Sequence, residues 1–471
     1  MRFQFPLLIC LVLFSPTLLP AQSPTPSETL AAMKTAAEFY RNDVASHGGY
    51  VYFYTVDLKG RYGEGSASED QIWVQPPGTP TVGMAYLVAY DATTDRFYLD
   101  AATEAGEALI YGQLKSGGWT NCIDFNPSGD RVAMYHNGNG KGKNNSSLDD
   151  DQTQSAIRFL MKLDEAHQFQ NKKIHEAAQM ALDALLAAQY PNGAFPQVWT
   201  GPVDQTLEIT KAAFPSYDWR TEGRIKNYWD MYTLNDGLAG SVSAVLIDAH
   251  QIYEDERYLT ALKKFGDFLI LAQLPEPQPA WAQQYSYEMI PIWARRFEPA
   301  AVAGRESQDA IETLLTIYEV THERKYLEPI PKAVKYLESS LLPDGRLARY
   351  YELQSNKPLY MNRNGKDYYL TYDDANLPDH YGWKTDANLE ELKDRYRRLV
   401  GGKTRDPVTP SPSEIRTIID RLDRAGRWIE TFQDQRLVGD QKFRPGDQYI
   451  SSEVFADNLT TLSRYLHAPA K

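Results

Sequence analysis

The stretch that decides the fold lies near the middle of the chain and reads Ile174-His175-Glu176-Ala177-Ala178-Gln179-Met180-Ala181-Leu182-Asp183-Ala184-Leu185-Leu186, followed by Tyr190-Pro191-Asn192-Gly193-Ala194-Phe195-Pro196. Its apolar side chains recur every three or four residues, which is typical of an amphipathic helix with one buried face. The Gly and Pro that follow end the helix, because Gly supplies a left-handed residue and Pro bars continuation. We therefore expect a fold built from helices that end in tight turns.

The same unit recurs along the chain. Similar periodicity predicts helices over residues 29–42, 97–114, 152–166, 174–189, 238–253, 258–273, 307–320, 330–341 and 413–433. Turns rich in Pro or Gly follow at residues 116–119, 190–196, 274–277 and 343–346. Paired helices with this spacing predict an all-α protein, an α/α toroid of helical hairpins whose loops gather at one end.

Several segments depart from this rhythm. Residues 49–76 alternate and predict a small β-hairpin insertion, and residues 120–148 and 200–231 form long loops. Long loops inside a compact domain are usually functional or disordered. Their position directly before acidic motifs favours function. Residues 400–412, rich in Gly, Pro and Thr, predict a flexible segment.

The first residues have the character of a targeting segment. Arg2 is followed by an apolar run over residues 3–19, and small and polar residues come after it. This pattern predicts a signal peptide over residues 1–21 and a secreted or periplasmic protein with a single domain over residues 22–471. No other run approaches the roughly 20 apolar residues that a spanning helix needs. Cys122 is then left alone, so no intrachain disulfide is expected.

Charge and composition narrow the class of ligand. The net charge of −13 argues against a nucleic-acid binder. The chain has 8 His against 62 Asp and Glu, which favours calcium or magnesium over zinc at any metal site. The 31 Tyr and 9 Trp fit either stacking on sugar rings or a helical core rich in aromatic side chains.

Two acidic motifs each stand directly before a predicted helix. They are Ser147-Leu148-Asp149-Asp150-Asp151 and Thr233-Leu234-Asn235-Asp236. One interpretation is helix capping, since carboxylates there accept free N–H bonds and oppose the macrodipole. However, three successive acids repel one another unless a cation lies nearby, so a hard-cation site is the alternative. Equivalent helix starts share one end of a toroid, where Asp149 and Asp236 would face one cleft.

Two arginine motifs lie further along the chain, Trp293-Ala294-Arg295-Arg296-Phe297-Glu298-Pro299 and Ala348-Arg349-Tyr350-Tyr351-Glu352-Leu353. Arginine binds carboxylates through a planar, bidentate fork, and its setting among aromatic residues indicates a site for sugars that carry carboxylates. Arg295 or Arg296 could instead form a surface ion pair with Glu298, and Arg349 could be a solvated strand end.

Five blocks in order resemble the family 10 pectate lyases. They are Ser147-Leu148-Asp149-Asp150 with Thr153 and Arg158-Phe159-Leu160, then residues 187–197, Tyr232-Thr233-Leu234-Asn235-Asp236, residues 293–299 with Glu306-Ser307, and residues 349–364. The family-like core covers about residues 110–385. This resemblance implies an α/α toroid that cleaves α-1,4-polygalacturonate by calcium-assisted β-elimination and releases 4,5-unsaturated oligogalacturonides.

The resemblance also implies roles for particular residues. Arg295 falls on the family's catalytic base, with Arg296 as the competing choice, and Asp149 also belongs to the catalytic group. The implied calcium ligands are Asp149, Asp150 and Asp236. The implied substrate-binding residues are Arg349, Arg363, Asn235, Lys357 and Arg296.

The chain departs from the family in places. Asp150 replaces the usual Asn, Lys357 replaces the usual Arg, and roughly 25 additional residues separate the two acidic motifs. Other hypotheses stay open: another uronate lyase or a glycoside hydrolase on the same toroid, or a non-catalytic pectin-binding homologue. In each case we expect a monomer with an acidic polysaccharide as its partner.

Overall fold

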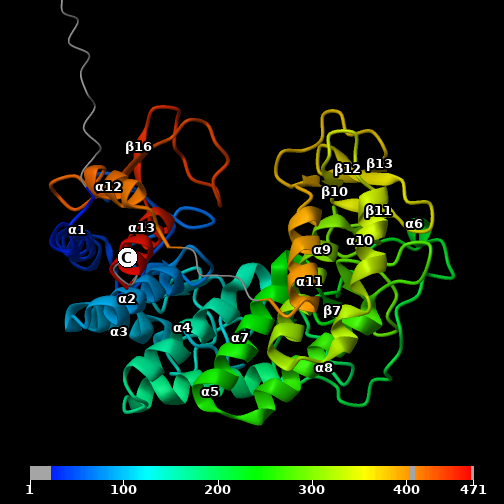
Figure 1. Cartoon of the computed structure of the whole chain (residues 1–471), viewed down its shortest axis with the longest axis horizontal. Coiled ribbons are helices and arrows are strands. Elements are labelled where there is room, and N and C mark those ends of the chain that lie inside the picture. Colours follow the sequence, from blue (N-terminus) through cyan, green and yellow to red (C-terminus); the bar gives the residue numbers. More distant parts are fainter. Residues whose placement is uncertain (1–22, 404–408, 468–471) are drawn as a thin grey trace, which may run out of the picture.

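The computed structural model describes residues 23–403 and 409–467. Helices dominate this part of the chain, and short strands lie in the segments between them (Figure 1). The helices are α1 (Pro26–Phe39), α2 (Thr79–Thr93), α3 (Arg96–Tyr111), α4 (Gln152–Ala166), α5 (Lys172–Ala187), α6 (Trp219–Glu222), α7 (Leu238–Tyr253), α8 (Glu256–Ala272), α9 (Gly304–Thr321), α10 (Ile330–Ser339), α11 (Leu389–Val400), α12 (Pro412–Asp420) and α13 (Ser452–His467). Short helical turns occur at η1 (Tyr40–Val44), η2 (Asp149–Asp151), η3 (Asn235–Gly237) and η4 (Arg324–Leu327).

The strands form small antiparallel sheets. They are β1 (Phe53–Thr55), β2 (Arg61–Tyr62), β3 (Gln71–Trp73), β4 (Cys122–Asp124), β5 (Ser146–Ser147), β6 (Val198–Trp199), β7 (Tyr232–Thr233), β8 (Gln284–Tyr285), β9 (Ala301–Ala303), β10 (Leu347–Ala348), β11 (Tyr350–Glu352), β12 (Pro358–Asn364), β13 (Asp367–Thr371), β14 (Lys384–Thr385), β15 (Ile429–Thr431) and β16 (Gln448–Ser451). Two sheets have four strands, in the orders β15-β16-β1-β2 and β13-β12-β11-β9.

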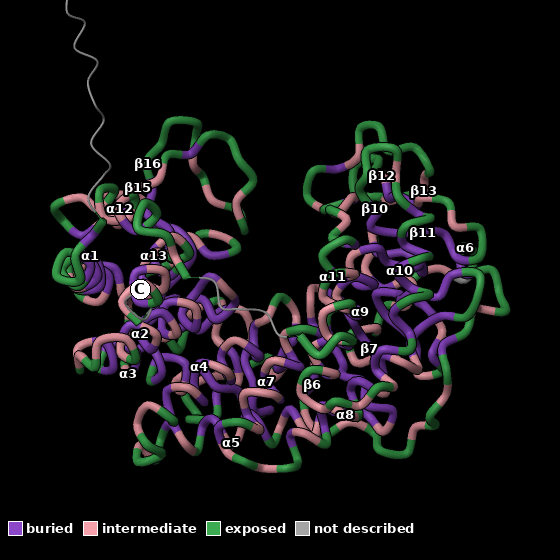
Figure 2. The backbone as a smooth tube through the Cα atoms, in the orientation of Figure 1, coloured by how far each residue is buried: buried purple, intermediate pink, exposed green. Residues whose placement is uncertain are grey.

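The predicted helical hairpins are confirmed. The pairs α2–α3, α4–α5, α7–α8 and α9–α10 pack in series along an arc (Figure 1). Helices α13, α2, α4, α7 and α9 follow one another in contact along one side, and α3, α5, α8 and α10 pack behind them. Buried residues line the facing sides of these helices, and the loops at the two ends of the arc are largely exposed (Figure 2).

A repeated glutamine joins each hairpin to the next. Gln113, Gln189 and Gln273 are buried just after α3, α5 and α8. Each side-chain amide donates one hydrogen bond within its own turn, to Gly117, Gly193 or Pro279, and one to a carbonyl of the next repeat, on Ala177, Ala261 or Pro329. Because both acceptors are buried backbone groups, the amide satisfies the turn and the inter-repeat contact together.

The helices of a pair begin differently. The side chains of Asp95, Asn171 and Asp255 cap α3, α5 and α8 by accepting hydrogen bonds from backbone N–H groups in the first turn. In contrast, α4, α7 and α9 begin without a side-chain cap. The N-termini of α4 and α7 follow the two acidic motifs, so the acids there are available for another role.

The two ends of the described chain lie together. Helix α13 packs against α1 and α2, and β16 pairs with β1 in a register that sets Phe53 opposite Ser451. The N-terminal and C-terminal segments thereby form one end of the arc. The other end carries β10–β13 and α11 (Figure 1).

Several elements differ from the sequence-based predictions. The hairpin expected over residues 49–76 is present as β1–β2, but the chain also forms larger sheets and the helices α2, α11 and α13, which were not predicted. The long helix predicted over residues 413–433 is wrong, because α12 ends at Asp420 and Gly426 follows in a left-handed turn with φ 83°. The proposed signal peptide, and residues 404–408 of the segment expected to be flexible, lie outside the described residues.

Most of the large aromatic side chains serve the core. Trp73, Trp119 and Trp281 are fully buried, as are many tyrosines. Cys122 is buried and unpaired within the described residues, as expected. Among the helices described, none is both long and apolar enough to cross a membrane.

Candidate active site

The two acidic motifs fold into the same local structure. In each, a two-residue strand, β5 or β7, leads through a helical turn, η2 or η3, into a long helix, α4 or α7. Asp150 and Asp236 occupy equivalent positions and both have left-handed backbones, with φ 44° and 52°. Aspartate adopts this conformation more readily than most residues. The capping interpretation is wrong for these motifs, because neither turn nor the helix after it has a side-chain cap hydrogen bond.

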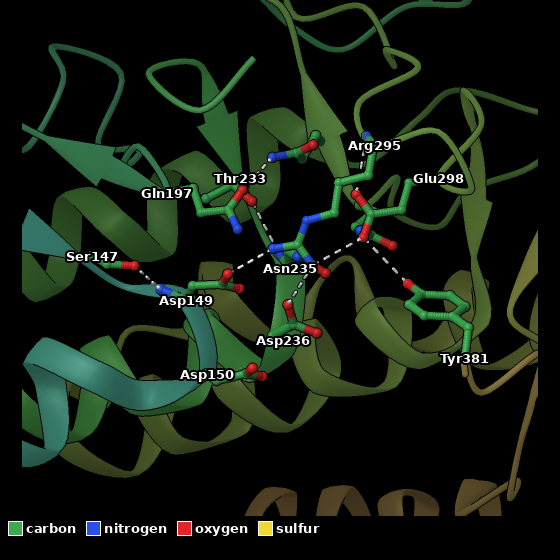
Figure 3. Close-up of polar contacts among 12 residues, drawn as sticks. Ser147, Asp149, Asp150, Gln197, Thr233, Asn235, Asp236, Arg295, Glu298 and Tyr381 are labelled. Atoms are coloured by element: carbon green, nitrogen blue, oxygen red, sulfur yellow. Dashed lines mark hydrogen bonds and ion pairs between the residues drawn. The ribbon is translucent and has the colours of Figure 1, made fainter. Parts of the chain in front are cut away.

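The two turns touch and bring three acids together (Figure 3). One carboxylate oxygen from each of Asp149, Asp150 and Asp236 lies within 4.8 Å of the others. Asp150 Oδ2 accepts a hydrogen bond from Gln75 Nε2 at 3.2 Å, and the Asp149 amide donates to Ser147 Oγ at 3.1 Å. Asp149 and Asp236, which the sequence predicted to face one cleft, therefore lie close together.

Burial and mutual repulsion raise the pKa values of Asp150 and Asp236. Burial, and then the charges of Asp149 and Glu64, raise the pKa of Asp150 to about 6. Burial also raises the pKa of Asp236 well above its ordinary range, with further contributions from Asp150 and Asp149. Like charges held this closely disfavour the ionised forms, and a bound cation would relieve that repulsion.

Arg295 points directly into the acid cluster (Figure 3). Its Nη2 donates to Asp149 Oδ2 at 2.7 Å, and its Nη1 lies 3.8 Å from Asp236 Oδ2 and 3.6 Å from Glu298 Oε1. Burial opposes the charged form of the guanidinium, but the three carboxylates outweigh burial and raise the pKa of Arg295 above its ordinary value. In this state Arg295 is a firmly held cation.

The turn that presents Arg295 is closed by Glu298. The backbone N–H of Ala294 donates to the carbonyl of Glu298 at 3.0 Å, and the N–H of Glu298 donates to the carbonyl of Arg295 at 3.0 Å. Glu298 is only 2% exposed and Arg295 is half-buried, so the surface ion pair considered from the sequence is wrong. Tyr381 also donates to Glu298 Oε1, at 3.4 Å.

Arg349 lies on the other side of Asp236. It is buried, so the solvated strand end considered from the sequence is wrong. Its Nη2 donates to Glu306 Oε1 at 2.7 Å and lies 3.9 Å from Asp236 Oδ1. The ring of Tyr381 covers the guanidinium at 5.0 Å. Arg295 and Arg349 thus approach Asp236 from two segments far apart in the chain.

The remaining predicted residues range from buried beside the acid cluster to exposed outside it. Asn235 is buried in η3, beside Asp236. Arg363 is exposed on β12 and lies close enough to His380 to lower the pKa of that histidine, after the larger effect of burial. Arg296 is exposed and donates to the carbonyl of Lys366 at 3.4 Å, outside the acid cluster. Lys357 is exposed before β12, with its ammonium group 5.3 Å from the centre of the Tyr372 ring.

Sequence reasoning missed four residues that build the site: Gln75, Glu298, Glu306 and Tyr381. Glu298 and Glu306 lie inside the sequence motifs, and their short distance along the chain from Arg295 was the signal that could have identified them. Gln75 and Tyr381 lie outside those motifs and reach the site only through the tertiary fold.

The acids form part of the lining of a large cavity. Its volume is about 1010 Å³, and it reaches from Asp150 and Asp236 past Arg305 to His380 and a C-terminal segment. A volume of this size is at the upper end of the range for ligand sites in proteins.

The sequence of residues 113–344 matches the family described as pectic acid lyase. This part of the chain, just under half of its length, is therefore a pectic acid lyase region. The matched range contains both acidic motifs and Arg295, and it identifies the protein as a polysaccharide lyase. Arg349 lies just beyond the matched range. No curated protein matches this chain.

Solved structures that align with this chain come from several kinds of protein. A mutant family 10 polysaccharide lyase from Cellvibrio cellulosa, in complex with trigalacturonic acid, is 18% identical; the match covers 69% of this chain and 99% of that one, with a TM-score of 0.47. An α-mannanase of glycoside hydrolase family 76 from Bacteroides thetaiotaomicron is 11% identical over 94% of each chain, with a TM-score of 0.42. A D-mannose isomerase is 13% identical over 71% of this chain and 75% of its own, also with a TM-score of 0.42.

Proposed function

We propose that this lyase is a pectate lyase that cleaves α-1,4-polygalacturonate by calcium-assisted β-elimination and leaves 4,5-unsaturated oligogalacturonides. The single observation that carries the proposal is the contact between Arg295 and Asp149 at the edge of a cluster of three acids. A basic group beside a site for a cation is the arrangement needed to remove a proton next to a sugar carboxylate.

The acid cluster fits a calcium ion. Asp149, Asp150 and Asp236 offer carboxylate oxygens, the donors that calcium prefers. Asp149 Oδ1 and both polar atoms of the Asn235 side chain are buried without a hydrogen-bond partner among the described residues. We propose that these polar atoms contact the ion and the substrate. When bound, calcium would neutralise the acids and the uronate carboxylate, which makes the neighbouring C5 proton more acidic.

Arg295 is the proposed proton acceptor. A guanidinium is a poor base while carboxylates raise its pKa, as Asp149, Asp236 and Glu298 do here. Once the charges of Asp149 and Asp236 are neutralised, burial, which lowers the pKa of Arg295, carries more weight. After loss of a proton to solvent, the neutral Arg295 then takes the C5 proton; a double bond forms between C4 and C5, the C4–O bond breaks, and the departing oxygen takes a proton from water.

Other side chains would hold the polymer. Arg349 is fixed by Glu306 and Tyr381 beside Asp236, where it could bind the carboxylate of the sugar that reacts. We assign the more exposed Arg363, Lys357 and Arg296 to neighbouring sugars, and Asn235 to a substrate hydroxyl or carboxylate. Arg296 is the weaker candidate for the base, because it faces away from the acids and contacts Lys366.

The proposal extends to the fold, the location and the oligomeric state of the protein. We propose that the arc of hairpins is an α/α toroid in which the acidic turns and the arginine segments meet at one end. A polymer substrate of this kind suits a protein exported to the periplasm or the medium that acts as a monomer.

A hydrolase on the same fold would use two carboxyl groups across the glycosidic bond. Asp149 and Asp236 are the pair available, but Arg295 contacts both and their nearest oxygens lie within 4.8 Å. An inverting hydrolase needs a separation of roughly 6.5–9.5 Å, which this pair does not provide.

Incubation with polygalacturonate tests the proposal. With calcium present, we expect ultraviolet absorbance from the unsaturated uronide to grow with time and to stop when a chelator is added. New reducing ends without that absorbance would falsify the lyase assignment. Binding without either signal would instead support a non-catalytic pectin-binding protein.

A further inference from the structure

The cavity above the acid cluster has a wall that comes from the C-terminal part of the chain. Residues 435–441, here called the 435–441 segment, line it opposite Asp150 and Asp236. The segment follows β15 and precedes β16, so it lies about a hundred residues beyond the end of the matched family range at residue 344. This chain therefore adds to the cleft a surface that the family match does not include.

The fold holds this segment in place from the N-terminal side. The N–H of Asp440 donates to the carbonyl of Glu64 at 3.0 Å. Gly439 has φ 85°, and a Cβ atom there would lie 2.3 Å from the carbonyl oxygen of Gly63. Only glycine tolerates both the left-handed backbone and this close approach. The segment is thus seated on the turn that contains Gly63 and Glu64.

Arg436 reaches from this segment to the opposite arm of the arc. Its Nη2 donates to the carbonyl of His380 at 3.0 Å, and among the described residues no carboxylate forms an ion pair with it. Among the described residues, the partner of Arg436 is therefore a neutral carbonyl group, whereas most other arginines pair with a carboxylate. An arginine in such a position keeps most of its capacity to bind an anion.

The cavity is lined by charges of both signs. Asp150 and Asp236 lie near Arg305, whose charge acts on Asp150, and Arg436 lines the cavity together with His380. Arg363 lies close to His380 as well. The two other acids in the lining are Glu64 and Asp440, and Asp440 is already paired with Lys442 at 2.7 Å. A chain with a carboxylate on every sugar, bound to the acids through a cation, would meet these arginines along its length.

We propose that Arg436 binds a uronate carboxylate at a subsite away from the cleavage point, and that the 435–441 segment thereby extends substrate recognition beyond the family core. This inference rests on the proposed function, because it takes oligogalacturonate as the ligand. Arg436 is a substrate-binding residue here and has no part in proton transfer. Its effect should therefore grow with the number of sugars in the substrate.

The test compares Arg436→Gln with Arg444→Gln, which removes a nearby exposed arginine that does not line the cavity. With calcium, we expect Arg436→Gln to lower kcat/KM on hexagalacturonate about tenfold through KM, with a smaller effect on trigalacturonate. Arg444→Gln should match the unmodified protein on both substrates. Thermal unfolding of the two variants checks that both are folded.

Two failures can be told apart. If the unmodified protein cleaves both oligomers and Arg436→Gln behaves like Arg444→Gln, only the role of Arg436 is overturned. If the unmodified protein neither cleaves the oligomers nor binds them in calorimetry with calcium, the proposed function fails and the role of Arg436 fails with it.

Discussion

Arg295 is held by carboxylates from three separate segments: Asp149, Asp236 and Glu298. Two of the three belong to the acid cluster, and the third closes the turn that carries the arginine. Protonation of Arg295 is therefore tied to the charge of the cluster. A cation at the acids and a proton on Arg295 oppose each other electrostatically, which is the coupling that an arginine base requires.

Arg295→Ala and Arg296→Ala separate the two candidates for the base. We expect Arg295→Ala to lower kcat on polygalacturonate at least about a hundredfold, because general-base catalysis typically contributes that much or more. Arg296→Ala should change kcat only a few-fold, since Arg296 faces away from the acids. Steady-state kinetics with calcium measures both. An inactive Arg296→Ala protein with a competent Arg295→Ala protein would reverse the assignment.

The pH profile provides a second signature of Arg295. Its pKa is raised, so the unprotonated form that acts as a base is scarce at neutral pH and increases as pH rises. We expect kcat/KM with calcium to increase from pH 7 toward alkaline pH, and the measurement is the initial rate at fixed calcium. A maximum below neutral pH would favour a protonated carboxylic acid, and hence a hydrolase.

Asp150→Asn tests the acid cluster as a metal site. The pKa of Asp150 is raised to about 6, so in the metal-free protein its stabilising contribution is present below its unfolded pKa and is lost as pH rises through 6. The Asp150 side chain is exposed, so solvent screening keeps this contribution to stability small. We expect Asp150→Asn to raise the metal-free Tm slightly at pH 8 and leave it unchanged at pH 4.

The same variant should weaken calcium binding about tenfold or more, because one charged ligand is lost. Calorimetric titration at pH 8 measures this loss. An unchanged calcium affinity would show that Asp150 is not a ligand.

At the scale of elements, the hairpins depend on buried polar contacts as well as on apolar packing. The glutamine after each second helix recurs in the sequence as Gln113, Gln189 and Gln273. Its side-chain amide supplies hydrogen-bond donors at the point where the helix ends and the chain turns. The same contact in three repeats explains why the turns have similar geometry although their sequences differ.

Gln189→Leu is the direct test of this contact. The change leaves the carbonyl of Gly193 without this donor, whereas the carbonyl of Ala261 loses one bond but keeps its hydrogen bond within α8. We expect the free energy of unfolding to fall by about 1–3 kcal/mol, the usual cost of one unpaired buried group. Gln251→Leu, at an exposed position on α7, should stay within about 0.5 kcal/mol. Denaturant unfolding measures both, and equal stabilities would remove the structural role of Gln189.

The elements that sequence analysis found are those with a strong helical period. Residues 174–186 show such a period, and α5 is where they predict it. Helix α2 was missed because it is apolar on nearly every side: the successive residues Ala85, Tyr86 and Leu87 point in different directions and are all buried, so no amphipathic period appears. The helix predicted over residues 413–433 failed because Gly426 adopts a left-handed backbone beside the carbonyl of Thr35, a contact that only the tertiary fold reveals.

The candidate site was predictable where its residues lie in local motifs. Asp149, Asp236, Arg295 and Arg349 converge as their motifs implied. Gln75, Tyr381 and Arg436 could not be found in this way, because each is brought to the cavity by packing between distant segments. The sequence contains no local signal for such contacts.

At the scale of the whole molecule, the two ends of the chain complete the cleft. Helix α13 packs against α2, and β16 pairs with β1, so the C-terminal part of the chain is anchored on the N-terminal part. The cavity is lined from this end of the arc and from the arm that carries His380. The acid cluster lies between them, where a long acidic polymer could contact both arms at once.

The central claim is that the protein breaks the glycosidic bond by elimination, without adding water. Mass spectrometry of the products formed from hexagalacturonate and calcium in ¹⁸O-labelled water tests it most directly. We predict product pairs whose masses sum to that of the substrate, with an unsaturated sugar at the new non-reducing end and no label introduced by the cleavage itself. Saturated products that together contain one additional, labelled water would contradict the claim.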